Sequence, residues 1–152
     1  MQNRLEPSQA DGVVNNSSEK YPQETHSLII GYLLWVFGFT GSHRFYYGKP
    51  ISGILYFCTL GLFFIGWFID LFLMPSLDRQ ANARFEPGPI SYNLTWILLT
   101  FFGVLGFHRF YMGKWISGFI YLFTVGLFGF GVLYDFLNVN SQVELENVKR
   151  RT

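Results

Sequence analysis

The stretch that decides the fold covers residues 38–70 and reads GFTGSHRFYYGKPISGILYFCTLGLFFIGWFID. Residues 103–135 repeat it without a gap, at a constant offset of about 65 residues, as GVLGFHRFYMGKWISGFIYLFTVGLFGFGVLYD. About half of the aligned positions are identical, which is far above chance even in a chain of biased composition. An internal repeat of this kind means that one structural unit is used more than once. The chain is therefore predicted to be two tandem copies of one unit.

The composition indicates that lipid is the solvent of this repeat. Half of the 152 residues are hydrophobic and 14% are charged, whereas a soluble domain usually carries about 25% charged residues. Aromatic residues reach 20% and there are 16 glycines, a mixture that is typical of helices in a bilayer. No basic run is long enough to grip nucleic acid, so that partner is excluded.

Each copy contains one long and one short apolar run. Residues 51–69 and 115–134 are long enough to span a hydrocarbon core. Residues 28–40 rise only about 20 Å as a helix, against a core of about 30 Å. They either cross with local thinning of the bilayer or dip into it without crossing.

Aromatic residues near the start of each short run favour crossing, because Tyr32 with Trp35 and Tyr92 with Trp96 resemble interfacial anchors. We therefore expect an all-α integral membrane protein with two tandem repeats of a transmembrane helical hairpin, four spans in total. The expected division is a disordered polar tail at 1–26, a first unit at 27–75, a polar linker at 76–91, a second unit at 92–140 and a polar tail at 141–152.

Crossing would place both tails and the central linker on one side of the membrane. That side carries more basic residues than the other and is expected to be cytoplasmic. Its cations are Lys20, Arg79, Arg84, Lys149, Arg150 and Arg151, and those expected on the opposite side are Arg44, Lys49, Arg109 and Lys114.

A polar motif joins the two apolar runs of each copy. Its members are Gly41, His43, Arg44, Phe45, Tyr46, Gly48 and Lys49, repeated as Gly106, His108, Arg109, Phe110, Tyr111, Gly113 and Lys114. A position at the membrane–water interface explains every residue type in the motif. Glycines permit a turn, cations bond helix-end carbonyls or lipid phosphates, and aromatic rings lie at headgroup depth. The motif is interpreted as a structural clamp, with a recognition surface or a proton site as the alternative. The nearby Cys, Asp or Glu ligands of a zinc site are missing from the motif, and no metal or cofactor is expected.

A carboxylate near the end of each long apolar run, Asp70 and Asp135, is a functional candidate because an intramembrane charge is costly. In one straight helix Asp70 would lie about 30 Å from the motif. A break at the glycines that follow residue 60, or at their counterparts in the second copy, would instead fold each unit into three short helices and bring Asp70 to Arg44. The sequence leaves both possibilities open.

The motif resembles that of the TM-two domain family, which is named for two transmembrane helices and a short polar linker. The resemblance covers 27–75 and 92–140, and the family's Arg-Phe pair maps onto Arg44-Phe45 and Arg109-Phe110. Some eukaryotic members carry Asp before this pair. This chain has His43 and His108 there, which resembles prokaryotic members and implies the plasma membrane of a prokaryote. The resemblance implies a small membrane module without an established activity.

The expected function is therefore a non-enzymatic, polytopic membrane protein that serves as an interaction or scaffold module. Its expected partners are membrane lipids together with a protein partner or further copies of the chain. The alternative is a small transporter or channel that acts as an oligomer, with Asp70 and Asp135 lining a path. The sequence has no nucleophile–base arrangement and no phosphate-cradling loop that would indicate an enzyme.

Overall fold

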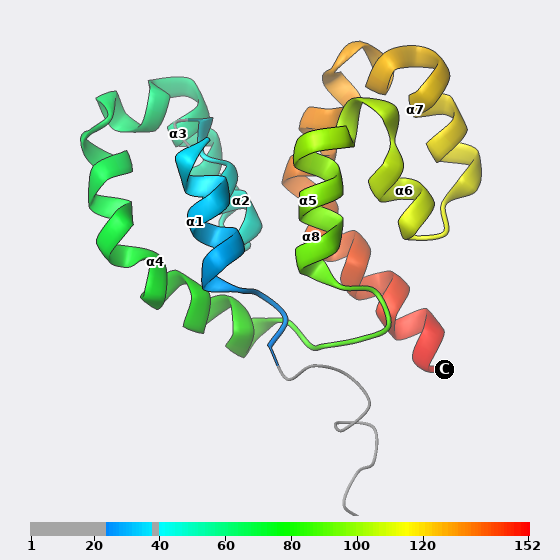
Figure 1. The fold of residues 1–152 in the computed structure, drawn as a ribbon, viewed down its shortest axis with the longest axis horizontal. Coiled ribbons are helices and arrows are strands. Elements are labelled where there is room, and N and C mark those ends of the chain that lie inside the picture. The colour runs from blue at the N-terminus through cyan, green and yellow to red at the C-terminus, as the bar shows by residue number, and fades with distance from the viewer. Residues whose placement is uncertain (1–23, 38–39) are drawn as a thin grey trace, which may run out of the picture.

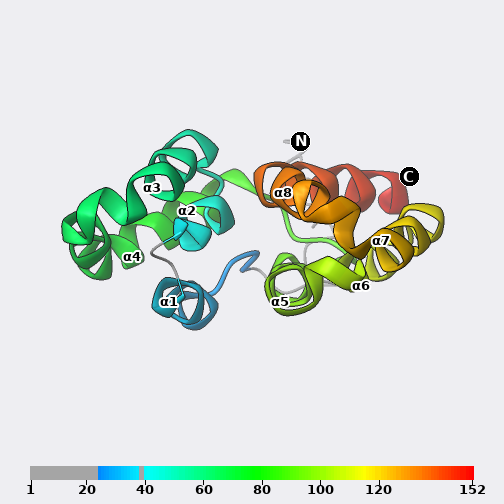
Figure 2. The same ribbon diagram turned by 90° about the horizontal axis from the view of Figure 1, so that it is seen from above.

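A computed structural model describes residues 24–37 and 40–152 and shows an all-helical chain over these residues. The first unit consists of α1 (Leu28–Val36), α2 (Ser42–Tyr46), α3 (Pro50–Phe63) and α4 (Ile65–Arg84). The second consists of α5 (Tyr92–Phe102), the short 3₁₀ helix η2 (Gly103–Leu105), α6 (Phe107–Tyr111), α7 (Trp115–Phe128) and α8 (Phe130–Arg151). The two units lie side by side (Figures 1 and 2).

The long apolar run of each unit is broken, so the straight-helix alternative is wrong. Backbone angles between Leu60 and Phe64 lie in the left-handed region, and the same turn recurs between Val125 and Gly129. The axes of α7 and α8 differ by 119° across it. Left-handed residues with a side chain are costly, and glycines at Gly61 and Gly126 lower that cost in both copies. Figure 1 shows both turns at the same end of the molecule.

No single helix in the described part of the chain is both long and apolar enough to cross a membrane, whereas α7 and α8 meet that criterion as a bent pair.

The turn after each motif lies beside the end of α4 or α8, whereas crossing hairpins would place Lys49 and Lys114 on the opposite side from the tails. Arg84 Nη1, near the end of α4, donates to the Gly48 carbonyl at 3.0 Å. Arg150, near the end of α8, donates to the Met112 carbonyl at 3.1 Å. The reason is that α2 and α6 run back beside α1 and α5, after reversals at glycines with positive φ, before α3 and α7 begin (Figure 1).

The expected linker and C-terminal tail are more helical than their polarity suggested. Helix α4 continues through the linker to Arg84, and α8 continues through the C-terminal tail to Arg151. Both segments place buried residues at helical spacing, which stabilises a helix by packing one face. These residues are Met74, Leu77 and Ala81 in α4, and Val139, Val143 and Asn147 in α8. Residues 1–23 of the expected disordered tail lie outside the described residues.

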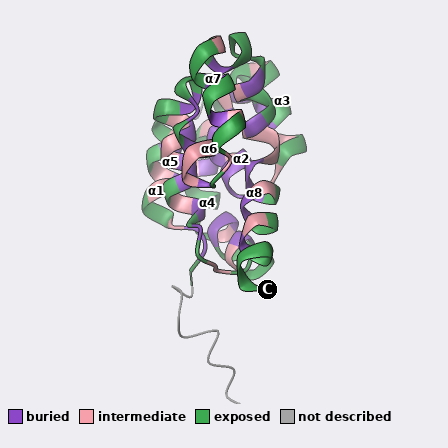
Figure 3. Cartoon of the chain, turned by 90° about the vertical axis from the view of Figure 1, so that its right-hand side faces the viewer, coloured by how far each residue is buried: buried purple, intermediate pink, exposed green. Residues whose placement is uncertain are grey.

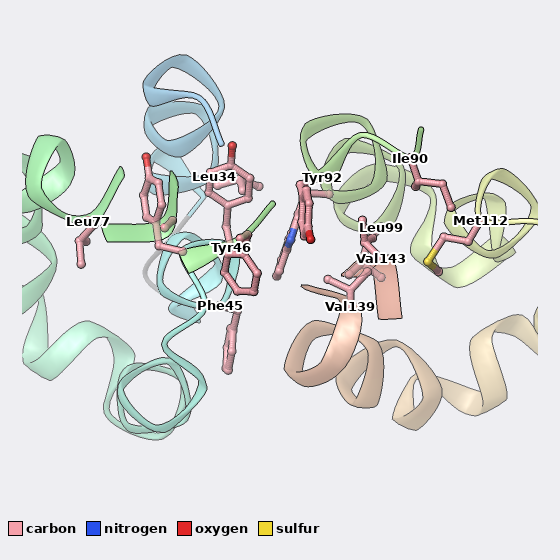
Figure 4. Packing of buried hydrophobic residues seen from close by; sticks show 14 of the residues in the cluster. Leu34, Phe45, Tyr46, Leu77, Ile90, Tyr92, Leu99, Met112, Val139 and Val143 are labelled. Atoms are coloured by element: carbon pink, nitrogen blue, oxygen red, sulfur yellow. The ribbon is translucent and has the colours of Figure 1, made fainter. Parts of the chain in front are cut away.

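The core contains residues of both units, while large apolar side chains are exposed on the outside. Figure 3 shows the buried and exposed residues along the chain. Phe45 and Tyr46 of α2 lie toward Tyr92 and Val139 of the second unit (Figure 4). This position corrects the expected role of two anchors, because Tyr92 and Trp96 are 1% and 0% exposed inside the protein. In the first unit Trp35 stacks on Trp67 with 4.3 Å between ring centroids. Each indole N–H of that pair donates to the other residue's carbonyl.

Whether one substitution lowers or raises the free energy of unfolding tests the left-handed turn. Gly129 has φ +87, and a Cβ built there meets no atom within 4 Å, so only the backbone resists a side chain. Gly129→Ala is expected to lower the free energy of unfolding by about 1 kcal/mol, measured by denaturant titration in detergent. In a continuous helix the same change would raise that free energy by about 1 kcal/mol. Phe64→Ala at the matching position of the first unit keeps a side chain at positive φ and is the control.

Candidate functional site

The motif of the first unit and its acidic residue form a buried ion-pair cluster. Arg44 Nε lies 2.7 Å from Asp70 Oδ2, and its Nη2 lies 2.5 Å from Oδ1, which makes the pair bidentate. His43 Nε2 donates to Oδ2 at 2.6 Å. Arg44 also donates to the Tyr56 hydroxyl at 2.9 Å, and its guanidinium lies 4.1 Å from the centre of that ring. The alternative in which Asp70 reaches Arg44 is confirmed.

The second unit repeats this cluster contact by contact. Arg109 Nε and Nη2 lie 2.9 and 2.6 Å from the two carboxylate oxygens of Asp135, and His108 Nε2 lies 2.7 Å from Oδ2. Arg109 donates to the Tyr121 hydroxyl at 2.9 Å, and its guanidinium lies 4.1 Å from the ring centre. Because residues 65 positions apart make the same bonds, the cluster is a property of the unit.

Burial makes these bonds strong and their loss costly. The side chains of His43 and Asp70 are fully buried, and that of Arg44 is 15% exposed. A buried charge pair repays its desolvation only when hydrogen bonds satisfy its polar atoms, and both oxygens of Asp70 accept such bonds. Since a carboxylate accepts, His43 carries its proton on Nε2; its Nδ1 is buried and has no partner within the described residues.

Glycines let the elements approach closely enough to assemble the cluster. Gly41 has φ +80, and a Cβ there would lie 2.6 Å from the Gly53 carbonyl oxygen. A Cβ on Gly53 would in turn lie 2.6 Å from the Phe45 ring. The motif glycine thus reverses the chain into α2, and the motif phenylalanine packs α2 flat against α3.

The second cluster extends toward the surface, and the first does not. Gln142 Nε2 donates to Asp135 Oδ1 at 3.0 Å, and its Oε1 accepts from Lys114 Nζ at 2.9 Å. Lys114 Nζ also lies 3.9 Å from Glu146. Leu77 and Ala81 occupy the positions that match Gln142 and Glu146 in the first unit, so Lys49 has no equivalent of these partners.

The two motif tyrosines have different environments. The Tyr46 hydroxyl accepts from the Ser27 backbone N–H at 2.7 Å and is also hydrogen-bonded to the Asn93 side chain of the second unit. Tyr111, its counterpart, accepts from the Ser91 backbone N–H at 3.0 Å. Tyr46 is fully buried, whereas Tyr111 is only partly buried. The difference arises because α2, but not α6, packs against the neighbouring unit.

Sequence reasoning missed several residues of the site. Tyr56 and Tyr121 complete the clusters, and their identity at matching positions of the repeat is a signal that could have revealed them. Asn140 and His26 lie between the units, and the repeat gave no signal for either of them because each is present in one copy only. Within the described part of the chain, no group of three or more His, Cys, Asp or Glu side chains could hold a metal ion.

The cluster geometry suits a clamp that holds three helical segments of each unit together. The bidentate Arg–carboxylate pair fixes orientation as well as distance, and the histidine and tyrosine lock both partners in place. Transport through Asp70 or Asp135 would require each carboxylate to exchange these partners.

Comparison with known proteins identifies the repeated unit. The model of the TM2 domain matches residues 24–72 and 88–137, which together make up more than half of the chain. The chain belongs to the TM2 domain family. The resemblance seen in the motif is thereby confirmed, and both units are TM2 domains. Membership indicates a membrane protein.

Curated relatives share the domain but only part of their length. One TM2 domain-containing protein of Dictyostelium discoideum is 51% identical over 61 residues, which is 40% of this chain and 40% of the relative. A second from the same organism is 56% identical over 54 residues, covering 35% of this chain and 39% of that protein. The matched part therefore spans about two fifths of these relatives. No solved structure matches. Because Dictyostelium is a eukaryote, these relatives give no support to the expected prokaryotic plasma membrane.

His26 of the first TM2 domain packs against the second domain and is expected to make the stability of the protein depend on pH. Its ring is fully buried beside Tyr46, Phe85 and Tyr92. Burial lowers its pKa from 6.5 to about 4, so the folded protein holds it neutral. Between these two values the unfolded chain binds more protons than the folded one, and stability falls with falling pH. We expect a loss of about 3 kcal/mol from pH 6.5 to pH 4.

Unfolding curves of the wild type and of His26→Phe across this range test the expected loss. In the variant, the free energy of unfolding should no longer show the part of its pH dependence that His26 causes. Phenylalanine fits the aromatic surroundings and does not titrate. Burial raises the pKa of nearby Asp78, so its contribution to stability changes with pH in the opposite direction. Because both proteins contain Asp78, the difference between them isolates His26. Equal slopes would contradict the assignment.

Proposed function

We propose that this protein is a non-enzymatic membrane protein whose two TM2 domains form one rigid interaction or scaffold unit in the bilayer. One observation carries the proposal: the arginine of each motif is paired with a carboxylate of its own domain, while large apolar side chains face outward. Such a surface fits lipid or the apolar face of a membrane partner. A buried interface between the domains supports the rigid unit.

The scaffold role predicts discrete protein neighbours within the membrane. A photo-crosslinking amino acid placed at Phe72 or Phe123, which are 73% and 82% exposed, should yield crosslinked products of defined mass in native membranes. The same probe at the buried Val143 is the control and should yield none. Crosslinks to lipid alone at both exposed positions would contradict the scaffold role.

Ion flux across liposomes distinguishes a transport role from the scaffold role. Liposomes that contain the purified protein are expected to leak protons and potassium no faster than empty liposomes, because the carboxylates are held in ion pairs. A flux that disappears in Asp70→Asn would replace the scaffold proposal with the transport alternative.

The membrane arrangement is part of this proposal. The sequence predicts four spans, with the motif turns facing away from the tails. The bonds from Arg84 to Gly48 and from Arg150 to Met112 support a different insertion, in which each TM2 domain enters and leaves the bilayer on the tail side.

Cysteine accessibility separates the two arrangements. Single cysteines at Lys49, Arg79 and Ser141, in a Cys58→Ser background, are labelled with an impermeant reagent in sealed vesicles of known orientation. Labelling of all three from one side is expected for the tail-side insertion. Labelling of Lys49→Cys from the opposite side would establish crossing hairpins instead.

A further inference from the structure

A groove runs along α3 in the first TM2 domain and combines apolar walls with cations at one end. Its volume is about 830 Å³. The walls come from successive turns of the helix, so an extended chain could lie along it. The side chains that line it include Ile51, Ile54, Leu55 and Cys58, with Lys49 and Arg84 beside the start of the helix.

The two cations are held together at the mouth of this groove. Arg84 Nη1 donates to the carbonyl of Gly48 at 3.0 Å, which places its guanidinium next to the residue that precedes α3, Lys49. Arg84 is exposed, and neither side chain has a carboxylate partner among residues 24–37 and 40–152. Two unneutralised cations at the end of an apolar groove favour a ligand with an anionic head and a hydrocarbon tail.

The second TM2 domain provides a natural comparison. Its matching groove has a volume of about 450 Å³, and Trp115 lines it where the first domain has Pro50. Lys114 there is bonded to Gln142 and lies 3.9 Å from Glu146. In the first domain the matching residues are Leu77 and Ala81. The first groove is therefore larger than its copy, and its lysine is free of the amide and carboxylate partners that Lys114 has.

We propose that this groove binds one anionic glycerophospholipid, with its phosphate between Lys49 and Arg84 and an acyl chain along Leu55 and Cys58. The regular part of α3, residues 50–59, is about 15 Å long, which suits most of one acyl chain lying beside it. The site rests on the membrane location of the protein and is independent of its scaffold role.

Cys58, the only cysteine of the chain, reports occupancy directly because it is exposed in the groove. The rate of its alkylation by a maleimide is measured for the full chain in neutral detergent, with phosphatidylglycerol, phosphatidylcholine or glycerol phosphate added. Phosphatidylglycerol should slow the reaction in a saturable manner. Its half-effective concentration should be roughly 30-fold below that of phosphatidylcholine, which corresponds to about 1 kcal/mol for each of two cations.

Two sets of variants complete the test. The double variant Lys49→Gln, Arg84→Gln should lose the preference for phosphatidylglycerol, and both residues lie at the surface, so folding is expected to persist and is checked by circular dichroism. The matched control carries its only cysteine at Phe123, the position that corresponds to Cys58, in a Cys58→Ser background. It should show a weaker anionic preference than Cys58 shows, because Lys114 is already bonded to Gln142 and lies near Glu146.

Three results would overturn the site. They are equal protection by the two phospholipids, an unchanged preference in the glutamine double variant, and equal protection by glycerol phosphate alone. The last would identify a phosphate site without a lipid tail. Alkylation is measured on the isolated protein. The result for the lipid site therefore does not depend on whether the scaffold proposal, which requires a protein partner, is correct.

Discussion

Replacing Asp70 by leucine is expected to lower the free energy of unfolding by about 3–5 kcal/mol. The change leaves Arg44, whose side chain is 15% exposed, without the carboxylate that accepts two of its hydrogen bonds. It also removes the acceptor of the fully buried His43. Denaturant titration in detergent measures the loss, and Asp135→Leu should reproduce it in the second TM2 domain.

A double-mutant cycle separates the lost pair from the lost packing. Arg44→Leu alone should also cost about 3–5 kcal/mol, because it leaves a buried carboxylate. The double variant Arg44→Leu, Asp70→Leu should lose clearly less free energy of unfolding than the two single variants lose in sum, since no unpaired charge remains. Additive losses would mean that the two residues do not act as a pair. Reversing the charges, with Asp70→Arg and Arg44→Asp, is expected to recover only part of the loss because His43 would then face a cation.

Asn140→Ala is expected to weaken the interface between the domains by about 3–5 kcal/mol. Its side chain accepts from the Trp96 indole at 2.6 Å and donates to the Phe45 and Tyr46 carbonyls at 3.2 and 2.8 Å. Asn140 is 7% exposed, and each buried polar group left without a partner costs about 1–3 kcal/mol. Limited proteolysis of the segment between α4 and α5, together with denaturant titration, measures the effect.

Asn138 provides the matched control on the same helix. It donates only to the Tyr134 carbonyl four residues earlier. Asn138→Ala should therefore change stability by less than about 1 kcal/mol. If the two alanine variants behave alike, Asn140 does not hold the domains together.

The pair of clusters also explains how a domain this small can keep a charged group among apolar helices. Each left-handed turn costs free energy and brings the carboxylate of α4 or α8 back to the motif. The ion pair then fixes the turn, because unwinding it would strand both charges. The strained turn and the buried pair thus depend on each other.

The sequence by itself determined the repeat, the helical class, the membership suggested by the motif and the identity of most cluster residues. These properties depend on residue type and spacing along the chain, which an internal repeat displays twice. The sequence also located the glycines at which the long apolar runs break. It could not show that a break occurs there, because glycine permits a kink without requiring it.

Only the tertiary structure decided which residues meet. Asp70 lies 26 positions from Arg44, and their contact requires the left-handed turn and the reversal at Gly41 together. The position of Lys49 near the end of α4 follows from α2 running back beside α1, and Trp96 of the second unit is buried because the first unit covers it. A hydrophobic pattern records that a side chain avoids water, but it does not record whether lipid or protein replaces that water.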